Sequence, residues 1–207
     1  MSQDDLSREA LTAIDHEIAE AVDERGFKVH LAMEVDDCFT SAQARAMLFR
    51  DIVVEAASVA ASRLGTIDFR PVNGSGRELR SVVGNADRRY RIKRATRVDD
   101  EFRIRANSDS ALASPNEPED EMLFGFLEQW VLGWSLTTDE RIDEVFVAEV
   151  LGVTEDKPHW LVLGPQVSLF TGPSGPEPSR EFHPTDGGGL PGFGGAVKGD
   201  DTGTGAA

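Results

Sequence analysis

The stretch from Asp87 to Ala106 constrains the fold of this chain most, because apolar and basic residues alternate along it. Tyr90 and Ile92 alternate with cations before a polar corner at 98–101, and the alternation resumes at Phe102. A period of two is typical of half-buried strands, so the pattern predicts a β-hairpin with one apolar and one basic face. The predicted basic face consists of Arg89, Arg91, Lys93, Arg103 and Arg105.

Five cations on one face of a hairpin are cross-strand or diagonal neighbours, and like charges in these positions destabilise a sheet. We therefore expect an acid to face them: the chain's own carboxylates, those of a protein partner, or a phosphate backbone. Our prediction is that the acidic segment after the hairpin, or carboxylates of residues 130–156, cover the basic face and pair with at least three of its cations. An open, unpaired patch would instead favour an external anionic partner.

Charge is distributed unevenly along the chain, whose formal net charge is −16. Residues 78–106 carry 9 bases and 5 acids, whereas residues 107–170 carry 2 bases and 13 acids. Proteins that bind nucleic acid or anionic membranes in general have a basic footprint. The composition therefore argues against both classes of protein. It favours binding to a basic protein partner, or else a negative charge that serves only to keep the protein soluble.

The first half of the chain combines helical and strand patterns. Apolar residues at helical spacing predict an amphipathic helix over 6–25 that ends at Gly26. Strict alternation over 27–36 predicts a strand. A capping box formed by Thr40 and Gln43 predicts the start of a long second helix, which stops at Gly65.

The second half of the chain predicts mainly strands. A short strand over 67–72 would complete a strand–helix–strand unit that begins at residue 27. This second strand would lie either parallel to the first, through a crossover connection, or antiparallel to it. Apolar, β-branched and aromatic runs separated by polar corners predict an antiparallel meander. Its strands would be 130–136, 144–153 and 160–170, whereas 122–127 fits a helix or an extended segment.

These patterns together predict a single α+β domain over residues 1–170, with a largely antiparallel sheet and two N-terminal helices packed on one of its faces. Residues 171–207 contain 11 glycines and 5 prolines. Such a composition offers too little apolar surface to offset chain entropy, so we expect a disordered tail.

No motif in the sequence indicates catalysis or a cofactor. The acidic clusters lack the spacing of an EF-hand loop, and the four histidines are scattered, so we assign no metal site. The single cysteine, Cys38, and the lack of a signal-peptide pattern at the N-terminus predict a cytoplasmic protein. No apolar stretch approaches the roughly 20 residues of a membrane span.

The function favoured by these observations is that of a non-enzymatic cytosolic interaction or regulatory protein, similar in role to an antitoxin, inhibitor or adaptor. Its acidic surface would bind a basic protein partner. The residues assigned to this surface are Glu117, Glu119, Asp120, Glu121, Asp139 and Glu140. The alternatives are nucleic-acid binding by the hairpin 87–106, and a metal-dependent hydrolase or nuclease. The sequence does not indicate an oligomeric state.

Overall fold

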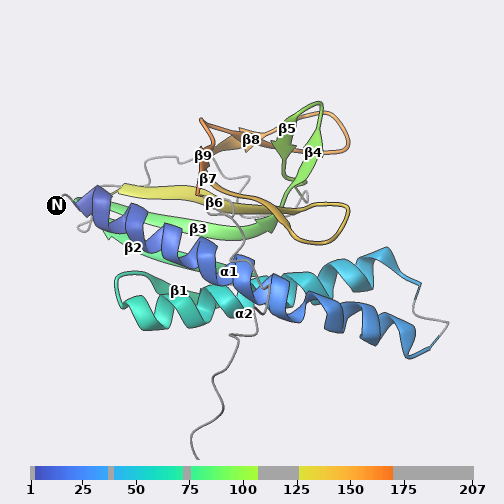
Figure 1. Ribbon diagram of the computed structural model, residues 1–207. Helices are drawn as coiled ribbons and strands as arrows, with labels where there is room; N and C mark the ends of the chain where they lie inside the picture. Colours follow the sequence, from blue (N-terminus) through green and yellow to red (C-terminus); the bar gives the residue numbers. More distant parts are fainter. Residues whose placement is uncertain (1–2, 37–39, 72–75, 107–125, 170–207) are drawn as a thin grey trace, which may run out of the picture. The chain divides into compact units, whose positions relative to one another are not determined.

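The structure, a computed structural model, describes residues 3–36, 40–71, 76–106 and 126–169 (Figure 1). Two helices, α1 (Gln3–Glu34) and α2 (Ala42–Leu64), pack together on one face of a seven-stranded sheet. The predicted α+β class, with both helices on one sheet face, is confirmed. Residues 171–207, for which we predicted disorder, lie outside the described part of the chain.

The seven-stranded sheet is mixed but mostly antiparallel, in the order β1, β2, β3, β6, β7 and β8, with β9 also paired to β7. Its strands are β1 (Asp68–Pro71), β2 (Arg77–Val83), β3 (Ala86–Arg94), β6 (Phe126–Leu136), β7 (Ile142–Val153), β8 (Leu161–Leu163) and β9 (Val167–Ser168). Among the described strands, β3 and β6 form the parallel pair. A separate two-stranded sheet consists of β4 (Thr96–Val98) and β5 (Glu101–Arg103).

Apolar side chains fill a layer on each face of the sheet. The larger core lies between the sheet and the helices, where Ile14, Phe49 and Trp134 are almost completely buried. On the opposite face, Val131 and Phe146 pack against residues from the chain around β5 and β8. This face is therefore divided into an apolar part over β6 and β7 and a charged part over β1, β2 and β3.

The strand predicted over 27–36 is wrong, because α1 continues through Gly26 to Glu34. The alternating pattern hides a helical one: Val22, Gly26 and Val29 are buried at helical spacing. Phe49 of α2 lies against Gly26, where an added Cβ would be 3.4 Å from the Phe49 ring. Close helix contact thus decides the structure of this segment, and the predicted strand–helix–strand unit becomes a helical hairpin. Both predicted returns of the strand at 67–72, parallel and antiparallel, required a strand at 27–36 and are therefore wrong; β1 pairs antiparallel with β2 instead.

The hairpin predicted over 87–106 is only partly correct. A tight turn does occur at Asp99 and Asp100, both with positive φ, but it joins only the short strands β4 and β5. β3 pairs instead with β2 on one side and with β6 on the other. The faces of β3 are as predicted, since Tyr90 and Ile92 are buried against the helices. The five cations therefore do not lie on one hairpin.

The remaining predictions concern helix ends and the meander. α2 is capped by Ser41, one residue after the expected Thr40, and the Ser41 hydroxyl accepts a hydrogen bond from the Ala44 amide at 3.3 Å. The stop at Gly65 is confirmed, with φ of 66°. The antiparallel meander is confirmed in β6, β7, β8 and β9. Residue 126 begins β6, whereas residues 122–125 lie outside the described chain.

Candidate functional site

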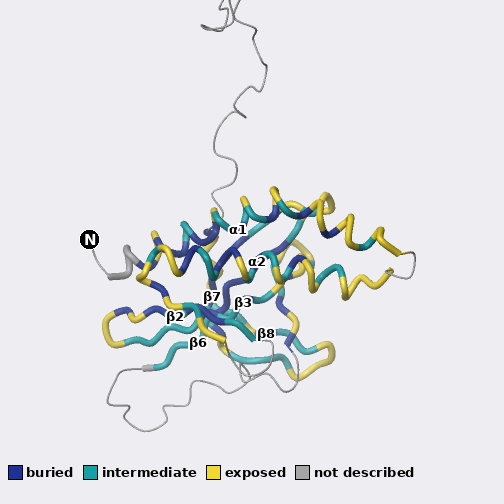
Figure 2. The backbone as a smooth tube through the Cα atoms, turned by 90° about the horizontal axis from the view of Figure 1, so that it is seen from below, coloured by how far each residue is buried: buried dark blue, intermediate teal, exposed yellow. Residues whose placement is uncertain are grey.

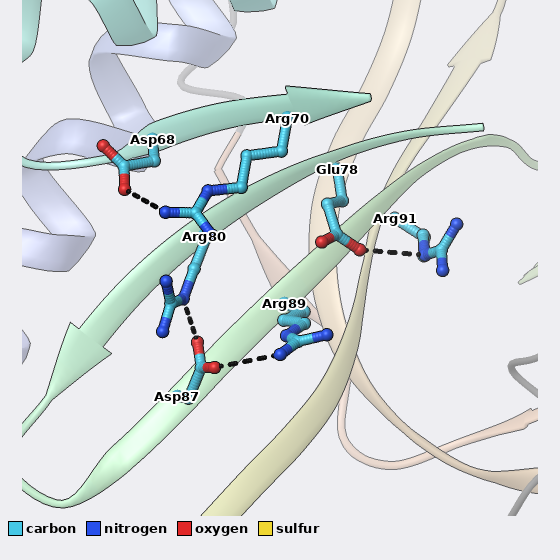
Figure 3. A network of polar contacts seen from close by, with 7 residues as sticks. All are labelled: Asp68, Arg70, Glu78, Arg80, Asp87, Arg89 and Arg91. Carbon is cyan, nitrogen blue, oxygen red and sulfur yellow. Dashed lines mark hydrogen bonds and ion pairs between the residues drawn. The ribbon is translucent and has the colours of Figure 1, made fainter. Parts of the chain in front are cut away.

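The charged part of the outer sheet face is the first candidate site (Figure 3). Register places Asp68 and Arg70 of β1 beside Arg80 and Glu78 of β2, and Glu78 in turn beside Arg91 of β3. Side chains on one face alternate along each strand, so these residues share the face that points away from the helices. We call this set the charged face: Asp68, Arg70, Glu78, Arg80, Asp87, Arg89 and Arg91.

Asp87 holds two arginines of the charged face. It accepts a hydrogen bond from Arg80 Nε at 2.6 Å and another from an Arg89 Nη at 3.3 Å. Burial raises the pKa of the Asp87 carboxyl, but the hydrogen bonds and positive charge of both arginines lower it by more, so its pKa lies below the usual value. The pKa of Arg80 is raised, chiefly by its hydrogen bond with Asp87. This carboxylate is therefore ionised and committed to internal partners.

Glu78 neutralises the next arginine along β3. Its carboxylate is buried and lies 3.2 Å from Arg91 Nε. On the opposite face of β3, Arg88 donates a hydrogen bond to Glu128 at 2.7 Å and also lies over the Trp130 ring. Each of these arginines thus has a carboxylate from a neighbouring strand.

Three of the five predicted basic-face residues are paired within the described chain: Arg89 with Asp87, Arg91 with Glu78, and Arg103 with Glu101. The acids come from β2, β3 and β5, so the prediction that carboxylates of 130–156 would pair with them is wrong for these arginines. The physical reason is proximity, because Asp87 and Glu101 lie two residues from their arginines on the same strand, and Glu78 lies directly opposite Arg91 on the adjacent strand. The acidic segment 107–121 lies outside the described residues.

The other two predicted cations have no ion pair within the described residues. Burial lowers the pKa of the Lys93 ammonium, and the positive charges of Arg91 and Arg50 lower it further. Arg105 is exposed, and its backbone forms an isolated bridge with Trp160. The structure therefore keeps Arg89, Arg91 and Lys93 together on one face of β3 but places Arg103 in β5 and Arg105 after it, outside the seven-stranded sheet.

The acidic residues predicted to bind a basic partner are described only in part. Glu117, Glu119, Asp120 and Glu121 lie outside the described chain. Asp139 is exposed in the turn between β6 and β7. Glu140 follows it but is only 18% exposed, because it pairs with Arg45 at 2.7 Å and with His30 at 2.5 Å. Glu140 thus ties this turn to both helices.

A second candidate surface, which the sequence analysis missed, lies on the last turns of α1 and at Val35, the residue that follows its end. Phe27, Leu31 and Val35 were predicted to form the core face of a strand, but they are 56%, 56% and 78% exposed. The helical spacing of Phe27 and Leu31 was the signal available in the sequence, and the stronger alternating pattern concealed it. We call these three residues the apolar stripe.

Comparisons with known proteins found no matching family model, no matching curated protein and no matching solved structure. Within the described residues, no three His, Cys, Asp or Glu side chains are grouped so that they could hold a metal ion. No described helix is both long and apolar enough to cross a membrane.

Proposed function

We propose that this chain is a non-enzymatic, cytoplasmic interaction protein with a regulatory, inhibitory or adaptor role, and that its acidic surface binds a basic protein partner. One observation carries the proposal: four arginines of residues 78–106 are matched by the chain's own carboxylates, Arg80 and Arg89 by Asp87, Arg91 by Glu78, and Arg103 by Glu101. With these cations neutralised inside the fold, the charge left for an external partner is negative, in a chain of net charge −16.

Nucleic-acid binding is the weaker proposal for the same reason. A phosphate backbone would have to displace Asp87 from Arg80 and Arg89, and Glu78 from Arg91. The remaining acidic surface would repel a polyanion. A basic protein meets neither obstacle, and its association would be fast and sensitive to salt.

The test is affinity capture from a lysate of the native host at about 50 mM and about 500 mM salt, conditions that span weak to strong screening. The wild-type chain should retain a partner rich in Lys and Arg at low salt and release it at high salt. Amide substitution of Glu117, Glu119, Asp120 and Glu121 should reduce the amount captured.

A matched control changes the net charge equally by amide substitution of Glu177, Glu181, Asp186 and Asp200, which should leave capture unchanged. Retention of no protein at either salt concentration would refute the proposal. Capture that is indifferent to salt would refute its electrostatic basis.

A further inference from the structure

The apolar stripe lies on the side of α1 that faces away from α2. Phe27 and Leu31 are four residues apart, a step that turns the helix by only about 40°, so they line one side of α1, and Val35 directly follows the helix end at Glu34. The contact of α1 with α2 is made by the opposite side, where Gly26 lies against Phe49. Figure 2 shows many exposed residues, in yellow, toward the C-terminal end of α1.

Single exposed apolar residues are ordinary on protein surfaces, whereas a row of large ones marks an interaction site. The sheet cores are already complete without these side chains. Because more than half of Phe27, Leu31 and Val35 is accessible, an apolar partner could bury a large part of each.

Charges around the stripe restrict what such a partner can be. Glu24 and Glu20 continue the same side of α1 toward its N-terminus, and both are exposed. Asp23 and Glu34 are exposed beside it, and Lys28 is the nearby exposed base. A second copy docked through this surface would oppose acids to acids, which is unfavourable. A basic partner would instead place its cations against these carboxylates.

We infer that the apolar stripe and its acidic border bind an amphipathic basic helix, with apolar anchors at helical spacing and Lys or Arg beside them. This inference rests on the proposed function and specifies where and how the basic partner binds. Apolar contact would supply most of the binding free energy, and the carboxylates would select for basic sequences.

The test uses a fluorescein-labelled helical peptide of about 18 residues, or five turns, made of Leu and Lys with all Leu on one side. A peptide of the same composition with scrambled order serves as the ligand control. Fluorescence anisotropy is measured with the full-length wild type and with the Leu31→Gln, Met47→Gln and Glu24→Lys variants. Gln has a helix propensity close to that of Leu and Met, so both helices should persist, as circular dichroism can verify.

Met47 is the matched control because it is an apolar residue of α2 that is 44% exposed. It lies two residues from the buried Phe49, about 200° round the helix, and therefore on the side of α2 away from α1. We expect the wild type to prefer the amphipathic peptide to the scrambled one. Leu31→Gln should weaken that binding about tenfold, the effect of losing a central apolar anchor, while Met47→Gln changes it less than about twofold. Glu24→Lys should weaken binding and also reduce its dependence on salt.

The outcomes separate this inference from the proposed function. If Leu31→Gln and Met47→Gln bind alike while binding remains sensitive to salt, the stripe is not the docking surface, although a basic partner is still supported. If the wild type binds neither peptide at about 50 mM salt, both ideas fail. A dimer of the wild type in sedimentation that dissociates in Leu31→Gln would assign the stripe to a second copy and overturn the inference.

Discussion

Arg80 of β2 and Asp87 of β3 form a diagonal ion pair across the ladder, with 2.6 Å between Arg80 Nε and Asp87 Oδ1. Register places Arg80 directly opposite Arg89, so two like charges meet at a position where they should destabilise the sheet. Asp87, two residues before Arg89, binds both guanidinium groups and resolves this conflict. A single carboxylate therefore makes it possible for β2 and β3 to carry arginines side by side.

Replacing this carboxylate should be costly. Asp87→Asn keeps the size of the side chain but leaves Arg80 and Arg89 without their acid, so we expect the free energy of unfolding to fall by about 1–3 kcal/mol. The measurement is denaturant unfolding followed by circular dichroism. Asp100→Asn is the control, because Asp100 pairs with Arg97 in a turn where its side chain is 94% exposed. Its effect should stay within about 0.5 kcal/mol. Equal effects of the two substitutions would contradict this role of Asp87.

The same pair predicts a dependence of stability on pH. The pKa of Asp87 is lower in the folded chain than in the unfolded one, so its contribution is complete above the unfolded value and is lost as pH falls through the folded pKa. The wild type should lose stability in acid more steeply than Asp87→Asn. Titrations of the two proteins that stay parallel below pH about 4 would show that Asp87 does not contribute in this way.

Lys93, in contrast to Asp87, should lower the stability of the folded state at neutral pH. Because the folded state lowers its pKa from the ordinary value of 10.5, protonated Lys93 opposes folding at neutral pH, and this cost is relieved only as pH rises through the folded pKa. Lys93→Met should therefore raise the melting temperature at pH 7. Lys28→Met, at an exposed position of α1, changes the net charge equally and should have little effect. A lower melting temperature for Lys93→Met would indicate that the charge is needed.

Two glycines that each follow a helical pattern should respond in opposite ways to alanine. Gly26→Ala should stabilise the protein by up to about 1 kcal/mol, since Gly26 lies inside α1 and the added Cβ would make only van der Waals contact with Phe49. Gly65→Ala should destabilise it by about 1 kcal/mol, because Gly65 has φ of 66° at the end of α2. Thermal unfolding of both variants checks this. Destabilisation by Gly26→Ala would support a helix end at that residue and would contradict a continuous α1.

Gly133 in β6 should not tolerate any side chain. An added Cβ would lie 2.3 Å from Cζ of Phe146, whose ring covers this glycine from the neighbouring strand. Gly133→Ala should lower the free energy of unfolding by about 1–3 kcal/mol. Gly152→Ala in β7, where no atom lies within 4 Å of the new Cβ, is the matched control. If Phe146→Leu reduces the cost of Gly133→Ala in a double-mutant cycle, the ring contact is the cause.

Local patterns in the sequence were sufficient for several features. Alternation along β3 correctly predicted that Tyr90 and Ile92 face the core, Gly65 marked the end of α2, and polar corners separated the strands of the meander. In these cases the decisive interactions lie within a few residues, because strand alternation, helix caps and turns follow from local backbone geometry. The α+β class followed from the same patterns.

Tertiary contacts alone decided the structure of residues 27–34 and the neighbours of β3. The first segment fits two periodicities, and Phe49, far along the chain, selects the helix by packing on Gly26. β3 pairs with β2 and β6 and not with the segment after its own turn, so Arg91 of β3 meets Glu78 of β2, and Asp87 of β3 meets Arg80 of β2. An amphipathic pattern specifies which side of a segment is buried but not what covers it. The covering element, and with it the charges left for a partner, depends on the free energy of packing between residues distant in sequence.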